Sequence, residues 1–301
     1  MTGAREAVLT TIGEALRDAT GRLRDAGSPT PRLDAELLIA HEVGRDRSWL
    51  MAHPEAPIAD AGALGAAVER RCAGEPIAYI RGFKEWRSMR VRTDARALIP
   101  RPETELLLEV AISEISRRMA TDDAPIVAWE VATGSGAVAT ALALRFREAL
   151  ALGRLRLIAS DISPDALELA AENLQAQGVE ALVDIACADL LEPAGTSLPR
   201  PDVVVANLPY VPSAEVLAAG GSFAFEPLLA LDGGRDGLDL IRRLLIQLDA
   251  RVMPGSTVLL EIGQGQAPML AALADGASID VERDLAGIDR VVRLHLPAPD
   301  R

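Results

Sequence analysis

Cysteine and aromatic residues are scarce in this sequence. Aromatic residues make up 3% of the 301 residues, and the two cysteines, Cys72 and Cys187, lie far apart in the chain. Their separation matches no metal-ligand spacing, and one pair cannot form the framework of a disulfide-rich domain. We therefore expect neither a metal site nor a disulfide framework, and the expected compartment is a reducing cytoplasm.

Positive charge is also in short supply. Lys and Arg total 31 against 44 Asp and Glu, which gives a formal net charge of -13. Because phosphate groups are bound chiefly by Lys and Arg, this balance argues against a general DNA- or RNA-binding surface. No long uncharged apolar run reaches membrane-spanning length, and the N-terminus lacks the basic-then-apolar pattern of a signal peptide. We expect a cytoplasmic monomer that binds neither a membrane nor nucleic acid directly.

The first part of the chain shows helical periodicity that is interrupted by Gly and Pro. Short helices are expected near residues 7–26, 33–43, 47–52 and 60–72. Such helices form small bundles, and no catalytic constellation is present among them. We interpret residues 1–82 as a helical substrate-recognition domain. Residues 74–82 break the helical pattern, and residues 83–97 alternate loosely, as a hairpin or linker does.

Residues 98–301 alternate between strands and helices. Strands are expected at 126–131, 155–161, 183–189, 203–207, 257–262, 279–282 and 290–294, and helices at 106–118, 137–150, 164–177, 238–252 and 267–274. Alternation of this kind predicts an α/β fold with a mainly parallel, doubly wound sheet.

The most informative stretch of this part is Val203–Pro212. An apolar, β-branched run predicts a strand buried on both faces, and Pro209 ends it because proline cannot donate to a sheet ladder. Asn207 and Tyr210 are then presented at the carboxyl end of a parallel strand, where open α/β sheets bind ligands.

Asn207-Leu208-Pro209-Tyr210 suits methylation of a planar NH2 group. The lone pair of such a nitrogen is delocalised, so two acceptors on its two hydrogens would orient it toward an incoming methyl group. The Asn207 side-chain carbonyl and the Leu208 backbone carbonyl supply two acceptors, and the Tyr210 ring can pack on the flat group. The alternative is an ordinary strand end followed by an Asn-Pro-type turn.

Three acidic residues close the first three predicted parallel strands. Glu130 suits a cationic amino-acid group, Asp161 a ribose diol and Asp189 an exocyclic amine. Small residues in the turn Ala132–Gly136 would let a ligand approach the backbone at a helix N-terminus. The alternative for each acid is a solvated loop residue.

Two phosphate-binding motifs are missing at this turn. The dinucleotide fingerprint Gly-x-Gly-x-x-Gly is absent, because Ala132–Gly136 keeps glycine only at its later positions, and there is no P-loop. An acid-rich pocket without phosphate ligands suits a sulfonium cofactor, S-adenosylmethionine, better than a dinucleotide.

Two prolines flank Arg101 ahead of an amphipathic helix. Glu103 and Glu105 have an ordinary interpretation, since acidic residues in a first helical turn stabilise the helix dipole. The functional interpretation is that Arg101, Pro102 and Glu103 form a rigid edge of the substrate or cofactor pocket. The sequence pattern does not decide between these two interpretations.

Several motifs, in this order, resemble those of the release factor glutamine methyltransferases. The resemblance covers nearly the whole chain and is carried by 98–105 (LIPRPETE), 133–136 (TGSG), 160–166 (SDISPDA), 207–210 (NLPY), 226–238 (EPLLALDGGRDGL), 260–263 (LEIG) and 284–292 (DLAGIDRVV). It implies a class I S-adenosylmethionine-dependent methyltransferase sheet with a small N-terminal helical bundle, and methyl transfer to the glutamine amide of the Gly-Gly-Gln loop of peptide chain release factors.

The resemblance also implies site residues. Those at the cofactor would be Glu130, Ala132, Thr133, Gly134, Ser135, Gly136, Asp161, Ile162, Asp189, Leu190 and Asn207. Those at the substrate would be Arg101, Pro102 and Glu103 together with Asn207, Leu208, Pro209 and Tyr210, the last four being the catalytic residues.

Three positions depart from the family pattern. Ala132 stands where the family usually has Gly, Glu130 replaces Asp, and Leu208 replaces the first Pro of Asn-Pro-Pro-Tyr. A Cβ at position 132 costs about 1 kcal/mol if the backbone there needs a positive φ. Two other functions stay open. An adenine-N6 nucleic-acid methyltransferase would share the Asn-Leu-Pro-Tyr site, and the altered Ala132 and Leu208 would suit a homologue that binds the cofactor without catalysis.

Overall fold

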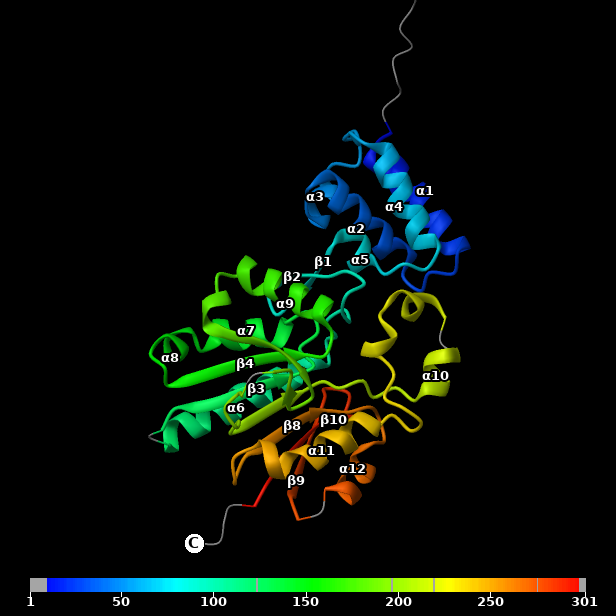
Figure 1. The fold of residues 1–301 in the computed structure, drawn as a ribbon. Coiled ribbons are helices and arrows are strands. Elements are labelled where there is room, and N and C mark those ends of the chain that lie inside the picture. Colours follow the sequence, from blue (N-terminus) through cyan, green and yellow to red (C-terminus); the bar gives the residue numbers. More distant parts are fainter. Residues whose placement is uncertain (1–9, 123, 196, 219, 275, 298–301) are drawn as a thin grey trace, which may run out of the picture. The chain divides into compact units, whose positions relative to one another are not determined.

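The computed structural model describes residues 10–122, 124–195, 197–218, 220–274 and 276–297 (Figure 1). The chain divides into two compact units. The smaller contains the described residues up to Gly82 together with Gly220–Phe225, and the larger contains the remainder, beginning at Phe83.

The smaller unit is built from helices α1 (Ile12–Asp25), α2 (Pro31–Val43), α3 (Arg47–Ala52), α4 (Ala61–Cys72) and α5 (Ile77–Arg81), with the 3-10 turn η2 (Gly221–Phe225). Side chains start three of them: Thr11 forms a capping box with Glu14, and Asp46 and Asp60 cap α3 and α4. The predicted break at 74–82 is wrong in part. Pro76 precedes the short helix α5 there, and Gly82 ends it in the left-handed region.

An eight-stranded sheet forms the centre of the larger unit, in the order β6-β5-β4-β3-β7-β8-β10-β9. Its strands are β3 (Ile126–Val131), β4 (Leu155–Asp161), β5 (Val183–Asp189), β6 (Glu192–Pro193), β7 (Val203–Ala206), β8 (Thr257–Glu261), β9 (Ser278–Arg283) and β10 (Asp289–His295). The five central strands from β5 to β8 are parallel, and the edges are antiparallel. The predicted mainly parallel α/β sheet is confirmed.

The helices of the larger unit alternate with its strands, and most of them pack against the sheet. They are α6 (Thr104–Thr121), α7 (Ala137–Arg145), α8 (Arg147–Ala151), α9 (Pro164–Ala176), α10 (Ser213–Ala218), α11 (Asp239–Arg251) and α12 (Ala267–Leu273), with 3-10 turns η1 (Glu180–Leu182) and η3 (Leu228–Ala230). Strand β7 shows the two-sided burial directly. Val203 and Val205 belong to the core cluster shared with α6 and α7, whereas Val204 and Ala206 belong to the cluster shared with α11 and α12.

Three local features differ from the sequence prediction. The single helix expected over 137–150 is interrupted at Phe146, whose backbone leaves helical geometry (φ -110°, ψ 23°) while its ring is buried in the core. The short strand β6 and helix α10 were not predicted. Two and six residues are too short for a hydrophobic period to register.

The strand order reverses beside β3. This strand pairs with β4 on one side and with β7 on the other, so Val131 lies opposite Ala206 in register. The loops after β3 and β7 therefore leave the sheet side by side at its carboxyl edge. Such a switch point is where open α/β sheets bind ligands.

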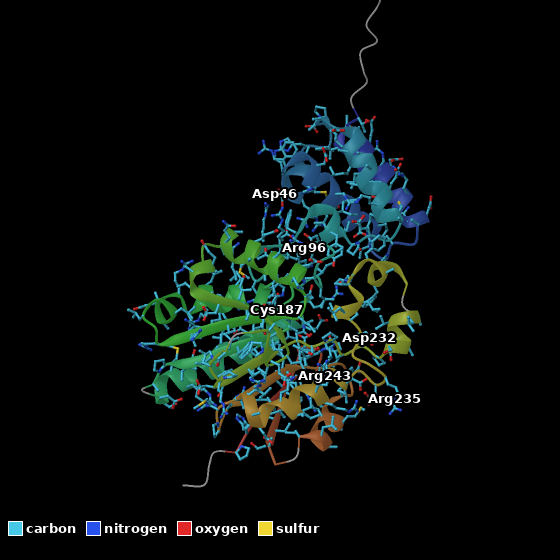
Figure 2. The ribbon with its side chains drawn as sticks, viewed as in Figure 1. Asp46, Arg96, Cys187, Asp232, Arg235 and Arg243 are labelled. Atoms are coloured by element: carbon cyan, nitrogen blue, oxygen red, sulfur yellow. The ribbon has the colours of Figure 1, made fainter. Side chains whose placement is uncertain are left out.

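The hairpin of β1 (Phe83–Trp86) and β2 (Met89–Arg92) belongs to the larger unit and is tied to α9. The Asn173 side chain accepts from the Arg92 N–H at 2.7 Å and donates to the Arg92 carbonyl at 3.1 Å. Arg96, labelled in Figure 2, pairs with Asp94 and with Glu172 of α9. These contacts hold the segment leading to residues 97–103 against the sheet domain.

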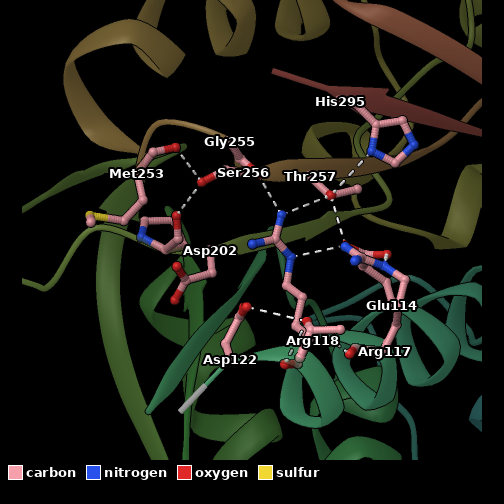
Figure 3. A network of polar contacts seen from close by, with 12 residues as sticks. Glu114, Arg117, Arg118, Asp122, Asp202, Met253, Gly255, Ser256, Thr257 and His295 are labelled. Carbon is pink, nitrogen blue, oxygen red and sulfur yellow. Dashed lines mark hydrogen bonds and ion pairs between the residues drawn. The ribbon is translucent and has the colours of Figure 1, made fainter. Parts of the chain in front are cut away.

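A buried ionic network joins α6 to the start of β8 (Figure 3). Glu114, with 1% of its surface exposed, accepts hydrogen bonds from Arg117, Arg118 and the Thr257 hydroxyl. Arg118 also donates to the Gly255 carbonyl at 2.6 Å. Burial alone would raise the pKa of Glu114, but the hydrogen bonds outweigh it and lower the pKa to about 2.

Replacing Glu114 with glutamine is expected to reduce the free energy of unfolding by about 3 kcal/mol at neutral pH. The folded pKa lies below the ordinary value of 4.5, so this stabilisation is complete above pH 4.5 and is lost as the pH falls toward 2. Urea unfolding of both proteins at a series of pH values tests this. The difference in the free energy of unfolding between the two proteins should become smaller below about pH 4.5. A difference that stayed constant with pH would contradict the lowered pKa of Glu114.

No helix in the described part of the chain has both the length and the hydropathy needed to cross a membrane. The same residues contain no group of three or more His, Cys, Asp or Glu side chains arranged to hold a metal ion.

Candidate functional site

A cavity opens at the switch point of the sheet, entirely within the larger unit. Most of the residues predicted from the sequence line it: Arg101, Glu130, Ala132, Thr133, Gly134, Ser135, Asp161, Ile162, Asp189, Leu190, Asn207, Leu208 and Pro209. Four predicted residues do not line it: Pro102, Glu103, Gly136 and Tyr210. The predicted juxtaposition of the Asn207 loop and the turn after β3 is therefore present.

The turn after β3 is held by hydrogen bonds that its backbone N–H groups donate. The Thr133 N–H donates to the Ser160 carbonyl at 2.8 Å, and the Gly134 N–H donates to Asp161 Oδ2 at 2.9 Å. Gly136 has φ 74°, and a Cβ built there would lie 2.9 Å from the Ala170 Cβ, so glycine is needed where α7 meets α9. Ala132 has φ 55°, so the strain considered for the missing glycine is present.

Two neighbouring buried carboxyl groups lie at the end of the cavity formed by the turn after β3. Burial raises the pKa of Glu130 to about 8; the Thr133 hydroxyl, 2.7 Å from Glu130 Oε2, lowers it, and Asp161 raises it further. Burial also raises the pKa of Asp161, against the hydrogen bonds that its oxygens accept from the Ser163 and Gly134 N–H groups. Two desolvated acids side by side favour a cationic ligand.

Asp189 is the last residue of β5 and already has a protein partner. Arg243 of α11, labelled in Figure 2, donates to Asp189 Oδ2 at 2.6 Å, and both side chains are about half exposed. Leu190 has φ 58°, a left-handed conformation that lets the chain turn tightly from β5 into β6. A ligand amine at Asp189 would share the carboxylate with Arg243.

The Asn207 side chain has a defined orientation. Its Nδ2 donates to the Thr104 hydroxyl at 3.1 Å, so the Oδ1 atom points away from Thr104. Within the described residues, neither Asn207 Oδ1 nor the Leu208 carbonyl accepts a hydrogen bond. Both residues line the cavity. Two acceptors for an NH2 group are thus available at the end of β7.

Tyr210 is not among the residues that line the cavity. Its hydroxyl donates to Glu261 Oε1 at 3.2 Å, and its carbonyl accepts from Gln266 Nε2 at 3.0 Å. Burial raises the pKa of the Tyr210 phenol well above its usual range, and the nearby Glu261 carboxyl adds to the rise. The phenol therefore stays neutral and cannot act as a general base at neutral pH.

Arg101 is held in an ion pair across the sheet domain. Its Nη2 lies 2.6 Å from Glu226 Oε1, and Glu226 Oε2 accepts from the Ile99 N–H at 3.1 Å. The Arg101 carbonyl accepts from the Trp86 indole at 3.0 Å. Because the Glu226 side chain is only 1% exposed, this contact fixes residues 99–101 at the cavity edge.

Four residues that contact predicted site residues were missed by sequence reasoning: Thr104, Glu226, Arg243 and Glu261. Three of them lie inside the stretches that carried the family resemblance, at 98–105, 226–238 and 260–263. For these three, their place in those stretches was the signal that could have identified them. Each of the four residues pairs with a partner at least 51 residues away in the sequence, so no local pattern marks the contact.

The chain is similar to known proteins over nearly all of its length. The family model described as the PrmC N-terminal domain matches residues 14–82. The release factor glutamine methyltransferase of Deinococcus radiodurans is 39% identical over 94% of this chain and 97% of that protein. The enzyme of the same name from Moorella thermoacetica is 38% identical over 93% of this chain and 96% of that protein.

Among solved structures, the hMettl16 catalytic domain in complex with MAT2A 3'UTR hairpin 1 aligns with a TM-score of 0.50 at 11% identity, over 79% of this chain and 83% of that one. A likeness at this identity speaks for the fold alone. The identity to the curated relatives over almost their full length shows that the chain belongs to the release factor glutamine methyltransferase family.

Proposed function

We propose that this protein transfers a methyl group from S-adenosylmethionine to the side-chain amide nitrogen of the glutamine in the Gly-Gly-Gln motif of peptide chain release factors. The observation that carries the proposal is the pair of acceptors at Asn207 Oδ1 and the Leu208 carbonyl, in one cavity with the acid-rich turn after β3. The names of the relatives supply the substrate.

The two acceptors answer the main chemical difficulty of amide methylation. An amide nitrogen is a poor nucleophile because its lone pair is delocalised into the carbonyl group. Hydrogen bonds from both N–H groups to Asn207 Oδ1 and the Leu208 carbonyl would fix the amide plane and direct the lone pair at the methyl donor. The second acceptor is a backbone atom, so leucine serves in place of the family's proline.

The acidic groups of the cavity suit the charge of S-adenosylmethionine, and the turn of small residues leaves room for a ligand at the backbone. When bound, S-adenosylmethionine supplies a methyl group on a cationic sulfur. Glu130 would hold its amino-acid portion, Asp161 its ribose hydroxyls, and Ala132–Gly136 would allow close approach to the backbone. Asp189 would take the exocyclic amine. No residue of the site has to remove a proton first, because the amide nitrogen loses its extra proton to solvent after the new N–C bond forms.

Binding of S-adenosylmethionine is expected to tighten by on the order of tenfold as the pH rises from 6.5 to 8.5. Glu130 is neutral below its pKa of about 8 and ionises as the pH passes that value, and the ionised form attracts the cation. Calorimetric titration of the wild type and Glu130→Gln separates this effect from titration of the ligand's own amine. The variant should bind more weakly and lose the extra pH dependence; equal pH profiles would contradict this role for Glu130.

We propose that the helical unit, residues 1–82, recognises the release factor, and that the protein acts as a cytoplasmic monomer without direct contact to nucleic acid. The match of residues 14–82 to a dedicated N-terminal family model supports a specific role for this unit. The net charge of -13 supports a protein rather than a nucleic-acid substrate.

The direct test incubates the purified chain with labelled S-adenosylmethionine and a full-length bacterial release factor, followed by peptide mass spectrometry. One methyl group on the Gly-Gly-Gln glutamine is expected, and none on a release factor whose motif glutamine is changed to glutamate. Total RNA and duplex DNA serve as parallel substrates. Methyl transfer to either nucleic acid, with an unmodified release factor, would overturn the proposal.

A further inference from the structure

One face of helix α11 lies along the turn that joins β5 to β6. Three of its side chains, spaced four residues apart, contact that turn: Arg243, Gln247 and Arg251. Residues at this spacing share one face of an α-helix. These elements all belong to the larger unit, and Arg243 lines the cavity together with Leu240, one turn earlier in the helix. The helix face therefore connects the turn to the cavity wall.

Gln247 holds the backbone of this turn. Its Oε1 accepts from the Leu191 N–H at 2.9 Å, and its Nε2 donates to the Asp189 carbonyl at 3.4 Å. Leu190, between them, has φ 58°, and β6 contributes only two residues to the sheet. Leu191 has 0% of its surface exposed, and a buried N–H without a partner is costly. The Gln247 side chain thus fixes the backbone that carries Asp189.

Arg243 holds the side chain of Asp189. Its Nη2 lies 2.6 Å from Asp189 Oδ2. Nothing else in the described part of the chain donates to this carboxylate, so Oδ1 keeps its capacity to accept a hydrogen bond. A charge-assisted hydrogen bond to one oxygen restricts the rotation of the carboxylate plane. Asp189 therefore offers the cavity one occupied and one available oxygen.

We propose that Arg243 and Gln247 are positioning residues that make the cavity specific for an adenine base. Gln247 fixes the backbone at Asp189, while Arg243 occupies Oδ2 and leaves Oδ1 to accept one N–H of the exocyclic amine. The inference rests on the proposed use of S-adenosylmethionine, and adds to it the residues by which this chain distinguishes an amino base from its deaminated counterpart.

The chemical basis of this specificity is the difference between a donor and an acceptor. The adenine amine donates hydrogen bonds, whereas the carbonyl oxygen that replaces it in a deaminated base only accepts them. An ionised carboxylate also only accepts, so Asp189 Oδ1 attracts the amine and repels the carbonyl oxygen. An oxygen that is already held in place does not have to be ordered when the ligand binds, which favours binding.

The test compares two ligands by calorimetry: S-adenosylhomocysteine, the product of methyl transfer, and S-inosylhomocysteine, in which a carbonyl oxygen replaces the amine. The wild type should bind the adenosyl ligand about 10- to 100-fold more tightly. Arg243→Met keeps an apolar side chain and removes the donors, so it should reduce this ratio to about threefold or less, mainly through weaker binding of the adenosyl ligand. Gln247→Met should lower the ratio in the same direction, and Arg243→Lys, which keeps a donor, should retain most of it.

Arg251→Met is the matched control. Arg251 lies on the same face of α11 and pairs with Glu192 at 3.9 Å, but it does not line the cavity. Both ion pairs are about half exposed, so neither substitution should disturb the fold. A ratio unchanged by Arg243→Met, or lowered equally by Arg251→Met, would overturn the inference. Tighter binding of the adenosyl ligand to Arg243→Met would do so as well, because Arg243 would then be a competitor for Asp189.

Asp189→Asn gives a second measurement. Arg243 can only donate, so it should turn the amide oxygen of the new side chain toward itself and leave the NH2 group facing the base. This variant should therefore prefer the inosyl ligand. Adding Arg243→Met frees the amide to flip and should remove that preference. An Asp189→Asn protein that still preferred the adenosyl ligand would contradict the positioning role of Arg243.

These outcomes can be told apart from failure of the proposed function. A chain that shows the ligand preference and loses it in Arg243→Met, but methylates no release factor, would support the inference and refute the proposed function. A wild type that methylates the release factor but binds both ligands equally would do the reverse.

Discussion

Replacing Asn207 with alanine is expected to lower kcat for glutamine methylation by about 10²- to 10³-fold, the usual cost of deleting one group that aligns the reacting atoms. The change removes Oδ1, one of the two acceptors proposed for the substrate NH2. It also leaves the Thr104 hydroxyl without its Asn207 partner. Single-turnover methylation of a release factor with saturating S-adenosylmethionine measures this step directly.

Binding and folding serve as controls for the Asn207 variant. Asn207 also lines the part of the cavity assigned to the cofactor, so a small loss of S-adenosylmethionine affinity is expected. That loss should be far smaller than the loss in kcat, because Glu130 and Asp161 supply most of the charge complementarity. A variant whose kcat stayed within about fivefold of the wild type, where about a hundredfold is expected, would remove the basis of the proposed mechanism.

Gly237→Ala is expected to lower kcat by about a hundredfold, because displacement of the Asn207–Tyr210 loop by about 1 Å suffices for such a loss. A Cβ at position 237 would lie 2.2 Å from the Tyr210 carbonyl oxygen and 2.6 Å from Gln266 Nε2. Those two atoms form the 3.0 Å hydrogen bond that holds the Tyr210 backbone. The loop has to move to admit the methyl group.

Gly287→Ala is the matched control for this substitution. Both glycines have φ +78°, but a Cβ at position 287 would meet no atom within 4 Å. Each variant therefore carries the same left-handed backbone cost of about 1 kcal/mol, and only Gly237→Ala adds the collision. Equal activity in the two variants would show that the contact between residue 237 and the Tyr210 backbone does not position the site.

The sheet could be predicted from local patterns because each strand carries its own signal. The run Val203–Ala206 is apolar at every position, and the structure buries alternate residues in different core clusters. Interruption of the helix at Phe146 could not be predicted in this way. The residue continues the apolar helical pattern, yet its backbone leaves helical geometry where its ring is buried in the core.

Some residues of the candidate site could also be predicted from local patterns, and others could not. Glu130, Asp161 and Asp189 could be found because each stands where a predicted strand ends. Tyr210 is predicted to pack on the substrate; in the structure it is not among the residues that line the cavity, and its hydroxyl donates to Glu261. Strand ends are visible in a sequence, whereas the direction of a side chain beyond a strand end depends on what packs against it.

By itself, the sequence determined the α/β fold, the order of its central strands along the chain, and the residues placed at the carboxyl ends of the strands. Only the tertiary structure decided which distant groups complete the site: Thr104 beside Asn207, 103 positions away, and Glu226 beside Arg101, 125 positions away. Hydrophobic periodicity is a property of neighbouring residues, so it specifies strands and helices. Hydrogen bonds and ion pairs between remote segments exist only after the sheet order and the loop paths have brought the partners together.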